Sequence, residues 1–316
     1  MDKKTIDFLS QSYSKNFVEV DCGKEIPGSP ERSIERFLLK SAENKYYLAE
    51  KHLKKSFILK NQIAGKLSVL KSLGLDQVNL YYTFSDDSYL AEYDGFYWQI
   101  SDFIQGTQLK RPEYVFEKEI GLAAADFLVS LKKICSDGLF FEDNNVFSLK
   151  SYIFELVRNI SKLNPDVFSR IEPVLKGLGD FFENYDNLKL QFCHGDFHPL
   201  NIIWEGTDIN KVIDWEFCGF KPEIYDAANF LGCIGVENPD SLSGPLAESF
   251  LVKIFQEKIY SGQSLYYLPF FVTALRFAWL SEWLRKKDPE MIELEIVYMN
   301  LLINNIKEIS RIWNLC

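Results

Sequence analysis

The spacing of apolar residues changes character near residue 105, and this change limits the folds open to the chain. Over the first hundred residues, apolar and polar residues alternate in short runs typical of strands, such as FVEV, SIERFLLK, KYYLAEKHL, SYLAEY and FYWQISDFI. Residues 56–75 have helical spacing instead, and so do long stretches after residue 105, including 113–134 and most of 242–316. The order predicts an α+β fold with two lobes: a small antiparallel-sheet lobe at residues 1–104 and a larger, mainly helical lobe at residues 105–316.

Turn chemistry adds detail to the first lobe. The segment SAENK separates two alternating runs, which predicts a hairpin. The segment CGKEIPGSPERS is rich in Gly, Pro and Ser, which predicts a loop between the first two strands. The run VNLYYTF at 78–84 is predicted as a further strand, and residues 3–13 as a short amphipathic helix.

Composition excludes some classes of function. The 316 residues carry a formal net charge of −10, whereas a dedicated nucleic-acid binder normally presents a basic surface. An acidic chain is compatible with a cationic substrate. The six cysteines show no C-x-x-C spacing, which favours reduced thiols. We find no apolar signal region at the N-terminus and no run of 18 apolar residues, so we expect a cytoplasmic protein without a nucleic-acid or membrane partner.

One polar segment, QFCHGDFHPLNIIWEGTDINKVIDWEFCGF at residues 191–220, carries the clearest chemical signal. We predict that NIIW pairs with KVIDW as a hairpin, which would bring Asn201 and Asp214 close together at its loop end. With Asp196 they form a set of two carboxylates and one amide. Such oxygen donors suit a hard cation such as Mg²⁺, which keeps waters and is completed by substrate phosphates.

Two other interpretations of this segment remain. His194 and His198 have the i, i+4 spacing of a zinc site, but that spacing aligns the two rings only on a helix. Gly195 and Pro199 disfavour a helix here, and no cysteine pattern supports zinc. The segment could also be a polar turn between strands, although a turn does not need this many ionisable groups.

The pattern H-G-D-x-H-P-x-N followed by I-D-W-E resembles the catalytic and metal-binding segments of the aminoglycoside phosphotransferase and choline kinase superfamily, small-molecule kinases with a protein-kinase-like fold. The resemblance implies that Asp196 orients and deprotonates the acceptor hydroxyl, while Asn201 and Asp214 bind Mg²⁺. It also implies that Asp226 braces the catalytic loop. His194 is expected to support the loop by hydrogen bonds, and His198 either packs in it or contacts the acceptor.

The same resemblance implies an ATP site in the first lobe. Gly28 and Ser29 lie in the loop that would cover the phosphates. Lys51 would pair with the phosphates, although a slip in strand register would place Glu50 there instead. The helix at 56–75 contains no Glu to pair with that lysine. The adenine-binding connection is expected at four consecutive residues: Ser101, Asp102, Phe103 and Ile104.

The acceptor is less well defined. Arg276, Trp279 and Trp283 share one helical face with Glu282 adjacent, and aromatic rings with a carboxylate suit an ammonium group. An aromatic stripe of this kind is also typical of a core. The segment IDWEFCG, in which Glu216 follows Asp214 by two residues, resembles the corresponding segment of choline- and thiamine-kinase-like relatives. We therefore predict an ATP- and Mg-dependent kinase for a small-molecule hydroxyl, with a cationic amino alcohol favoured. Aminoglycosides, homoserine and sugars remain alternatives, as does a nucleotide-binding pseudokinase regulator.

Overall fold

The computed structural model describes residues 1–21, 26, 32–84, 88–136 and 147–315. Two compact units emerge from its internal contacts. Unit 1 contains Met1–Gln108 and Leu200–Cys218, and unit 2 contains Leu109–Pro199 and Gly219–Cys316. The hairpin that carries Asp214 is thus grouped with the first hundred residues rather than with the helical lobe. The lobe boundary placed at residues 104 and 105 remains a prediction.

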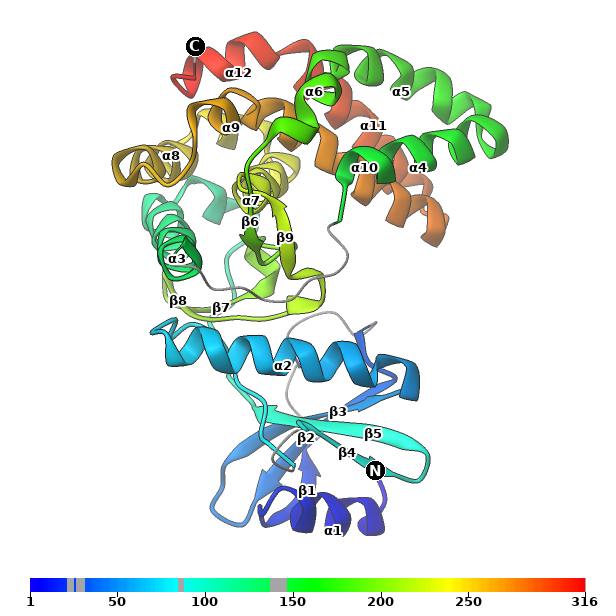
Figure 1. The fold of residues 1–316 in the computed structure, drawn as a ribbon, viewed down its shortest axis with the longest axis vertical. Helices are drawn as coiled ribbons and strands as arrows, with labels where there is room; N and C mark the ends of the chain where they lie inside the picture. The colour runs from blue at the N-terminus through cyan, green and yellow to red at the C-terminus, as the bar shows by residue number, and fades with distance from the viewer. Residues whose placement is uncertain (22–25, 27–31, 85–87, 137–146, 316) are drawn as a thin grey trace. The chain divides into compact units, whose positions relative to one another are not determined.

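Unit 1 is built on a five-stranded antiparallel sheet in the order β1-β2-β3-β5-β4. Its strands are β1 (Phe17–Asp21), β2 (Glu35–Ser41), β3 (Tyr46–His52), β4 (Leu90–Tyr93) and β5 (Phe96–Asp102). Figure 1 shows the sheet with helix α1 (Lys3–Ser12) on one side and helix α2 (Phe57–Ser72) on the other. Both faces of the central strands are therefore covered.

Helix α1 closes a small core on its side of the sheet. Leu9 and Tyr13 of the α1 region pack with Tyr47, Ala49 and Trp98 of the sheet. The Tyr13 hydroxyl also donates a hydrogen bond of 2.5 Å to the carbonyl oxygen of Trp98. Burial of these side chains fixes the strand register, because a slip of one residue would turn each of them to the other face.

Unit 1 also contains a hairpin formed by β7 (Ile202–Glu205) and β8 (Asp208–Val212). The segment between α2 and β4 contacts the hairpin through a parallel bridge between Val78 and Val212, and contacts the sheet through an antiparallel bridge between Tyr81 and Ser101. Two short 3-10 turns, η2 (Lys54–Ser56) and η6 (Trp215–Phe217), precede α2 and follow the hairpin, and η5 (Pro199–Asn201) lies where the chain passes from unit 2 to unit 1.

Unit 2 is mainly helical. Its helices are α3 (Lys118–Ser136), α4 (Leu149–Leu163), α5 (Pro165–Gly177), α6 (Gly179–Asn184), α7 (Tyr225–Glu237), α8 (Pro245–Glu257), α9 (Gly262–Tyr266), α10 (Leu268–Lys286), α11 (Pro289–Asn304) and α12 (Ile306–Ile312). The 3-10 turns are η3 (Glu113–Phe116), η4 (Tyr185–Asn187) and η7 (Pro239–Ser243). Two strands, β6 (Leu190–Cys193) and β9 (Gly219–Pro222), pair with each other. Helix α7 is buried along most of its length.

The predicted fold class is confirmed: a small antiparallel-sheet unit precedes a larger helical one. The SAENK hairpin is confirmed as the turn between β2 and β3. The predicted strand at 78–84 is wrong, because Val78 and Tyr81 there form only isolated bridges. Within the described residues, no helix is long and apolar enough to cross a membrane.

Candidate functional site

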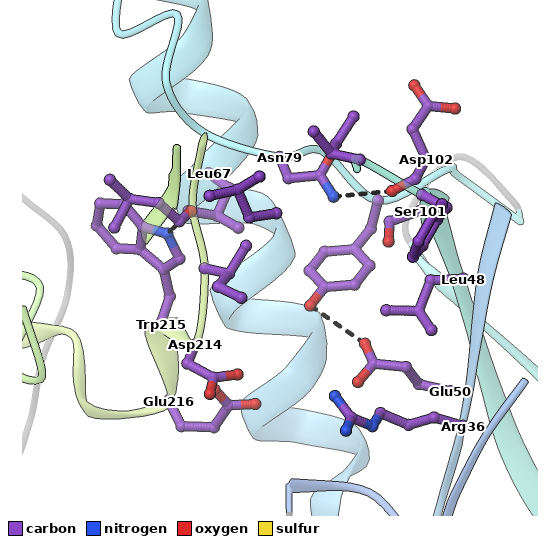
Figure 2. Close-up of a pocket in the computed structure, with 16 residues that line it drawn as sticks. Arg36, Leu48, Glu50, Leu67, Asn79, Ser101, Asp102, Asp214, Trp215 and Glu216 are labelled. Atoms are coloured by element: carbon purple, nitrogen blue, oxygen red, sulfur yellow. Dashed lines mark hydrogen bonds between the residues drawn. The ribbon is translucent and has the colours of Figure 1, made fainter. Parts of the chain in front are cut away.

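A pocket in unit 1 gathers several residues that the sequence analysis singled out. It is lined by Ser101, Asp102, Phe103 and Ile104 at the end of β5, and by Asp214 and Glu216 after the hairpin. Arg36 of β2, Glu50 of β3, Asn79 and Tyr81 add further polar groups to the lining. Figure 2 shows Arg36 and Glu50 projecting from the sheet side, with Asp214 and Glu216 on the other side of the pocket.

The segment that ends β5 is held by its neighbours. The Asn79 side-chain amide donates to the carbonyl oxygen of Asp102 at 3.0 Å, and the Tyr82 hydroxyl donates to the Asp102 carboxylate at 2.7 Å. The Phe103 amide donates to the carbonyl oxygen of Tyr46 at 3.1 Å. These bonds give the wall of the pocket a fixed backbone.

The hairpin brings Asn201 and Asp214 together as predicted, but at its open end rather than at its loop. Ile202 pairs with Val212, and the Ile213 amide donates to the carbonyl oxygen of Asn201 at 2.9 Å. The turn lies at the opposite end, between Glu205 and Asp208. Asp214 itself adopts a left-handed conformation (φ 62°, ψ 56°), which ends the strand and is uncommon for a residue other than Gly, Asn or Asp.

A buried group of charges underlies this pocket. Lys60 of α2 forms a salt bridge with Glu216, and the Tyr81 hydroxyl lies 3.4 Å from the Glu50 carboxylate, to which it donates. Burial raises the pKa of Glu50, and the positive charge of Lys60 opposes that rise. Burial, followed by the Lys60 charge, lowers the pKa of His52 to about 3, so this imidazole is neutral at physiological pH.

Lys51 does not lie in this pocket. Its ammonium group is 2.7 Å from the Glu35 carboxylate of β2 and 4.1 Å from the centre of the Phe96 ring. It shares the α1-side face of β3 with Tyr47 and Ala49, whereas Glu50 lies on the pocket side. Gly28 and Ser29 lie outside the described residues.

In unit 2, Asp226 of α7 holds the loop that carries Asp196. Its carboxylate accepts hydrogen bonds from the backbone amides of His194 at 2.7 Å and Gly195 at 2.8 Å. Gly195 has φ 83°, a conformation that favours glycine. The His194 ring is fully buried, and its Nδ1 accepts the Asp196 amide at 3.1 Å. Burial raises the pKa of Asp226 to about 6, against the effect of the two amide bonds.

The predicted acceptor residues are only partly brought together. His198 lies 3.7 Å from the Asp196 carboxylate and contacts Trp279 edge-on, and Trp279 in turn lies beside Trp283. Glu282 pairs instead with Arg285 and Lys286 of its own helix, and the Arg285 hydrogen bond, the largest cause, lowers the pKa of Glu282 to about 2. Glu216 belongs to the pocket of unit 1.

Sequence reasoning missed Arg36, Tyr81 and Lys60. For Lys60 a signal exists: it occupies the same helical stripe as Ile63, Ala64, Leu67 and Leu70, which are all buried. A lysine on the apolar stripe of a helix must find an anionic partner. The sequence offers no comparable signal for Arg36 or Tyr81.

Among the residues that the structure describes, no three His, Cys, Asp or Glu side chains form a ready-made metal cage. That is compatible with Mg²⁺, which typically uses one or two protein oxygens and completes its shell with phosphates and water. The amide of Asn201 and the carboxylate of Asp214, adjacent at the open end of the hairpin, are donors of that kind. The predicted zinc alternative gains no support, because His194 and His198 are engaged with Asp196 and Trp279.

Comparison with known proteins places this geometry in context. Residues 34–257 match the model of a phosphotransferase enzyme family. No curated protein matches the chain in sequence. Solved structures that resemble the chain include an aminoglycoside phosphotransferase from Alicyclobacillus acidocaldarius, with a TM-score of 0.62 and 13% identity over 98% of this chain and 96% of that one.

Two further structures have similar folds. An amicoumacin kinase in complex with AMP-PNP, Ca²⁺ and Ami has a TM-score of 0.66 and 13% identity over 96% of this chain and 94% of that one. A choline/ethanolamine kinase family protein from Mesorhizobium loti has a TM-score of 0.57 and 14% identity over 96% of this chain and 92% of that one. At such identities the likeness concerns the fold alone.

Proposed function

The chain belongs to the phosphotransferase enzyme family, and from this premise we propose that it transfers the γ-phosphate of ATP to a hydroxyl group of a small molecule with Mg²⁺ as cofactor. The observation that carries the proposal is the pocket of unit 1. There the predicted adenine-binding residues Ser101–Ile104 and the predicted metal ligand Asp214 line one cavity.

Each residue has a proposed role. The end of β5 takes the adenine edge through its backbone, and Asn201 with Asp214 would hold Mg²⁺. The metal ion would neutralise charge that develops on the phosphates. Asp196 accepts the proton of the acceptor hydroxyl, and its loop is kept in place by Asp226. Little covalent chemistry is required, because phosphoryl transfer depends mainly on positioning and charge neutralisation.

A substitution at Asp196 tests this function. We expect Asp196→Asn to lower the rate of phosphorylation by about 100-fold or more, because an amide cannot accept the hydroxyl proton. The Kd for Mg·ATP should change less than about threefold, since the nucleotide pocket is untouched. Product formation and nucleotide binding are measured on the same preparation. Asp208→Asn, an exposed change on the hairpin, is the matched control. Phosphorylation by Asp196→Asn at the control rate would refute the assignment.

For the acceptor we propose a small molecule with a cationic amino-alcohol group, as in choline. His198, Trp279 and Trp283 form a continuous series of rings that begins 3.7 Å from Asp196, and ring faces attract ammonium groups. An aminoglycoside is the second candidate, since the fold is shared with aminoglycoside phosphotransferases. A protein that binds Mg·ATP without turnover on any acceptor would instead be a pseudokinase regulator.

A further inference from the structure

The pocket of unit 1 has an unusual distribution of charge between strand and helix. Protein kinases place a lysine on the third strand and pair it with a glutamate on the following helix. In this chain the β3 residue at the pocket is Glu50, and the lysine of the strand, Lys51, lies on the other face with Glu35. The buried charge on the following helix, α2, is Lys60.

Lys60 does not line the pocket itself, but its ammonium group contacts a carboxylate that does. It forms a salt bridge with Glu216, and the two side chains are 5% and 14% exposed. Among the charges acting on Glu50 it has the largest effect, and it favours the ionised carboxylate. One lysine therefore offsets two carboxylates that line the pocket from opposite sides.

The residues that line the pocket show why it needs the positive charge of Lys60. Three carboxylates, on Glu50, Asp214 and Glu216, face the space that a nucleotide would occupy. Without compensation they would repel its phosphates. Arg36, the partner of Glu50 in the strand register, adds a cation that lines the pocket itself. Because these charged groups lie close together and are shielded from solvent, each electrostatic interaction between them is stronger than it would be in water.

An independent observation comes from the interface between β3, β5 and α2. Gln99, which pairs with Glu50 across the sheet, is fully buried, and the described residues offer its side-chain amide no hydrogen-bond partner. The Nε2 atom of buried His52 has none either. Interfaces that serve stability alone rarely leave such groups unsatisfied, whereas functional sites do so more often.

We propose that the strand–helix ion pair is reversed in this chain, so that Glu50 of β3 provides the carboxylate and Lys60 of α2 the cation that makes the pocket accept a nucleotide's phosphates. Lys60 is a positioning residue: it acts by offsetting Glu216 and Glu50. This inference rests on the proposed function, because it concerns the same nucleotide pocket.

The test compares ligands with and without phosphates. The Kd values for Mg·ATP and for adenosine are measured by calorimetry on the wild type, Lys60→Met and the matched control Lys51→Met. We expect Lys60→Met to weaken Mg·ATP binding by more than about tenfold and adenosine binding by less than about twofold, because only the phosphates meet the uncompensated carboxylates. Lys51→Met should leave both constants within about twofold, since its surface pair lies on the other face.

A paired variant, Lys60→Met with Glu216→Gln, guards against a loss of folding, because it removes the cation together with the carboxylate that it contacts. With one carboxylate fewer to offset, the Kd for Mg·ATP should stay within about fivefold of the wild type. If Lys60→Met does not fold, this variant decides: folded protein that binds adenosine but not Mg·ATP would overturn the inference.

The remaining outcomes are separable. Lys60→Met with wild-type affinity for Mg·ATP, or with equal losses for ATP and adenosine, would overturn the reversed pair and leave the proposed function standing. So would a selective loss of Mg·ATP binding in Lys51→Met. Wild-type protein that binds no nucleotide would overturn the proposed function together with this inference.

Discussion

Asp226 shows how a single buried carboxyl group sets the geometry of a loop. Two backbone amides donate to it, which fixes the turn at Gly195 directly before Asp196. Burial nevertheless raises its pKa to about 6 from an ordinary value of 3.8. The folded protein therefore holds this proton at pH values at which the unfolded chain has released it.

The sign of the resulting pH dependence follows from linkage. Because the folded state binds the extra proton, the contribution of Asp226 to the free energy of unfolding is largest below about pH 4 and falls as the pH rises to about 6. We expect a decrease on the order of 2–3 kcal/mol over this interval, which is absent in Asp226→Asn. Urea unfolding of both proteins at a series of pH values measures the difference. A difference that does not change with pH would show that the pKa of this carboxyl group is the same in the folded and the unfolded protein.

At the residue scale, the sequence predicts which side chains carry the chemistry better than it predicts which face of a strand borders the pocket. Alternation along β3 correctly places Lys51 with Tyr47 and Ala49. It does not say which face borders the pocket, because α1 and α2 cover both faces and each strand face carries buried residues. Asn201 and Asp214 were predictable as neighbours because a hairpin has few registers, whereas the Lys60–Glu216 pair joins residues 156 positions apart.

At the scale of elements, helix packing depends on where a Cβ atom fits. Gly121 of α3 lies against α8, and a Cβ atom there would be 2.2 Å from the carbonyl oxygen of Leu246. The two helices would have to separate, so we expect Gly121→Ala to lower the free energy of unfolding by about 2 kcal/mol or more. Gly65 of α2 has open space at the same position. Gly65→Ala should therefore raise stability by about 0.5–1 kcal/mol. Chemical denaturation of both variants checks the pair, and equal effects would contradict the packing argument.

Elements with strong local signals were predictable. Helix α2 and the strands β2, β3 and β5 have long periodic patterns, and their bounds agree with the sequence to within a few residues. The segment at 78–84 alternates like a strand but forms only two isolated bridges, from Val78 to Val212 and from Tyr81 to Ser101. The pair β6–β9 was not predicted, because each strand has four residues and its partner lies across the hairpin in sequence. Such pairing is decided by tertiary contacts rather than by local propensity.

For the whole molecule, the order of strands and helices together with one motif was enough to predict the fold class and the family. The acceptor was not predictable in the same way. Its candidate residues come from α10, from η6 and from the loop before η5. What they do depends on their neighbours: Glu282 is engaged by Arg285 and Lys286, while Trp283 Nε1 donates to Glu295 at 3.4 Å. Side-chain partners of this kind leave no periodic trace in a sequence.

The net charge of −10 leads to a prediction about the acceptor. An acidic protein attracts a cationic substrate, and at 0.1 M salt this attraction is largely screened beyond about 10 Å. With Mg·ATP saturating, we expect kcat/KM for choline or another cationic amino alcohol to fall about threefold or more between about 0.02 and 0.3 M salt. The uncharged isostere 3,3-dimethylbutan-1-ol should be phosphorylated more slowly and with little salt dependence, because it lacks both the charge and the cation–π attraction to Trp279.

Initial rates over a panel that also includes ethanolamine, thiamine, homoserine, sugars and kanamycin provide the measurement. A neutral sugar that is phosphorylated fastest, with no effect of salt, would reject the cationic acceptor while leaving the phosphotransferase assignment intact.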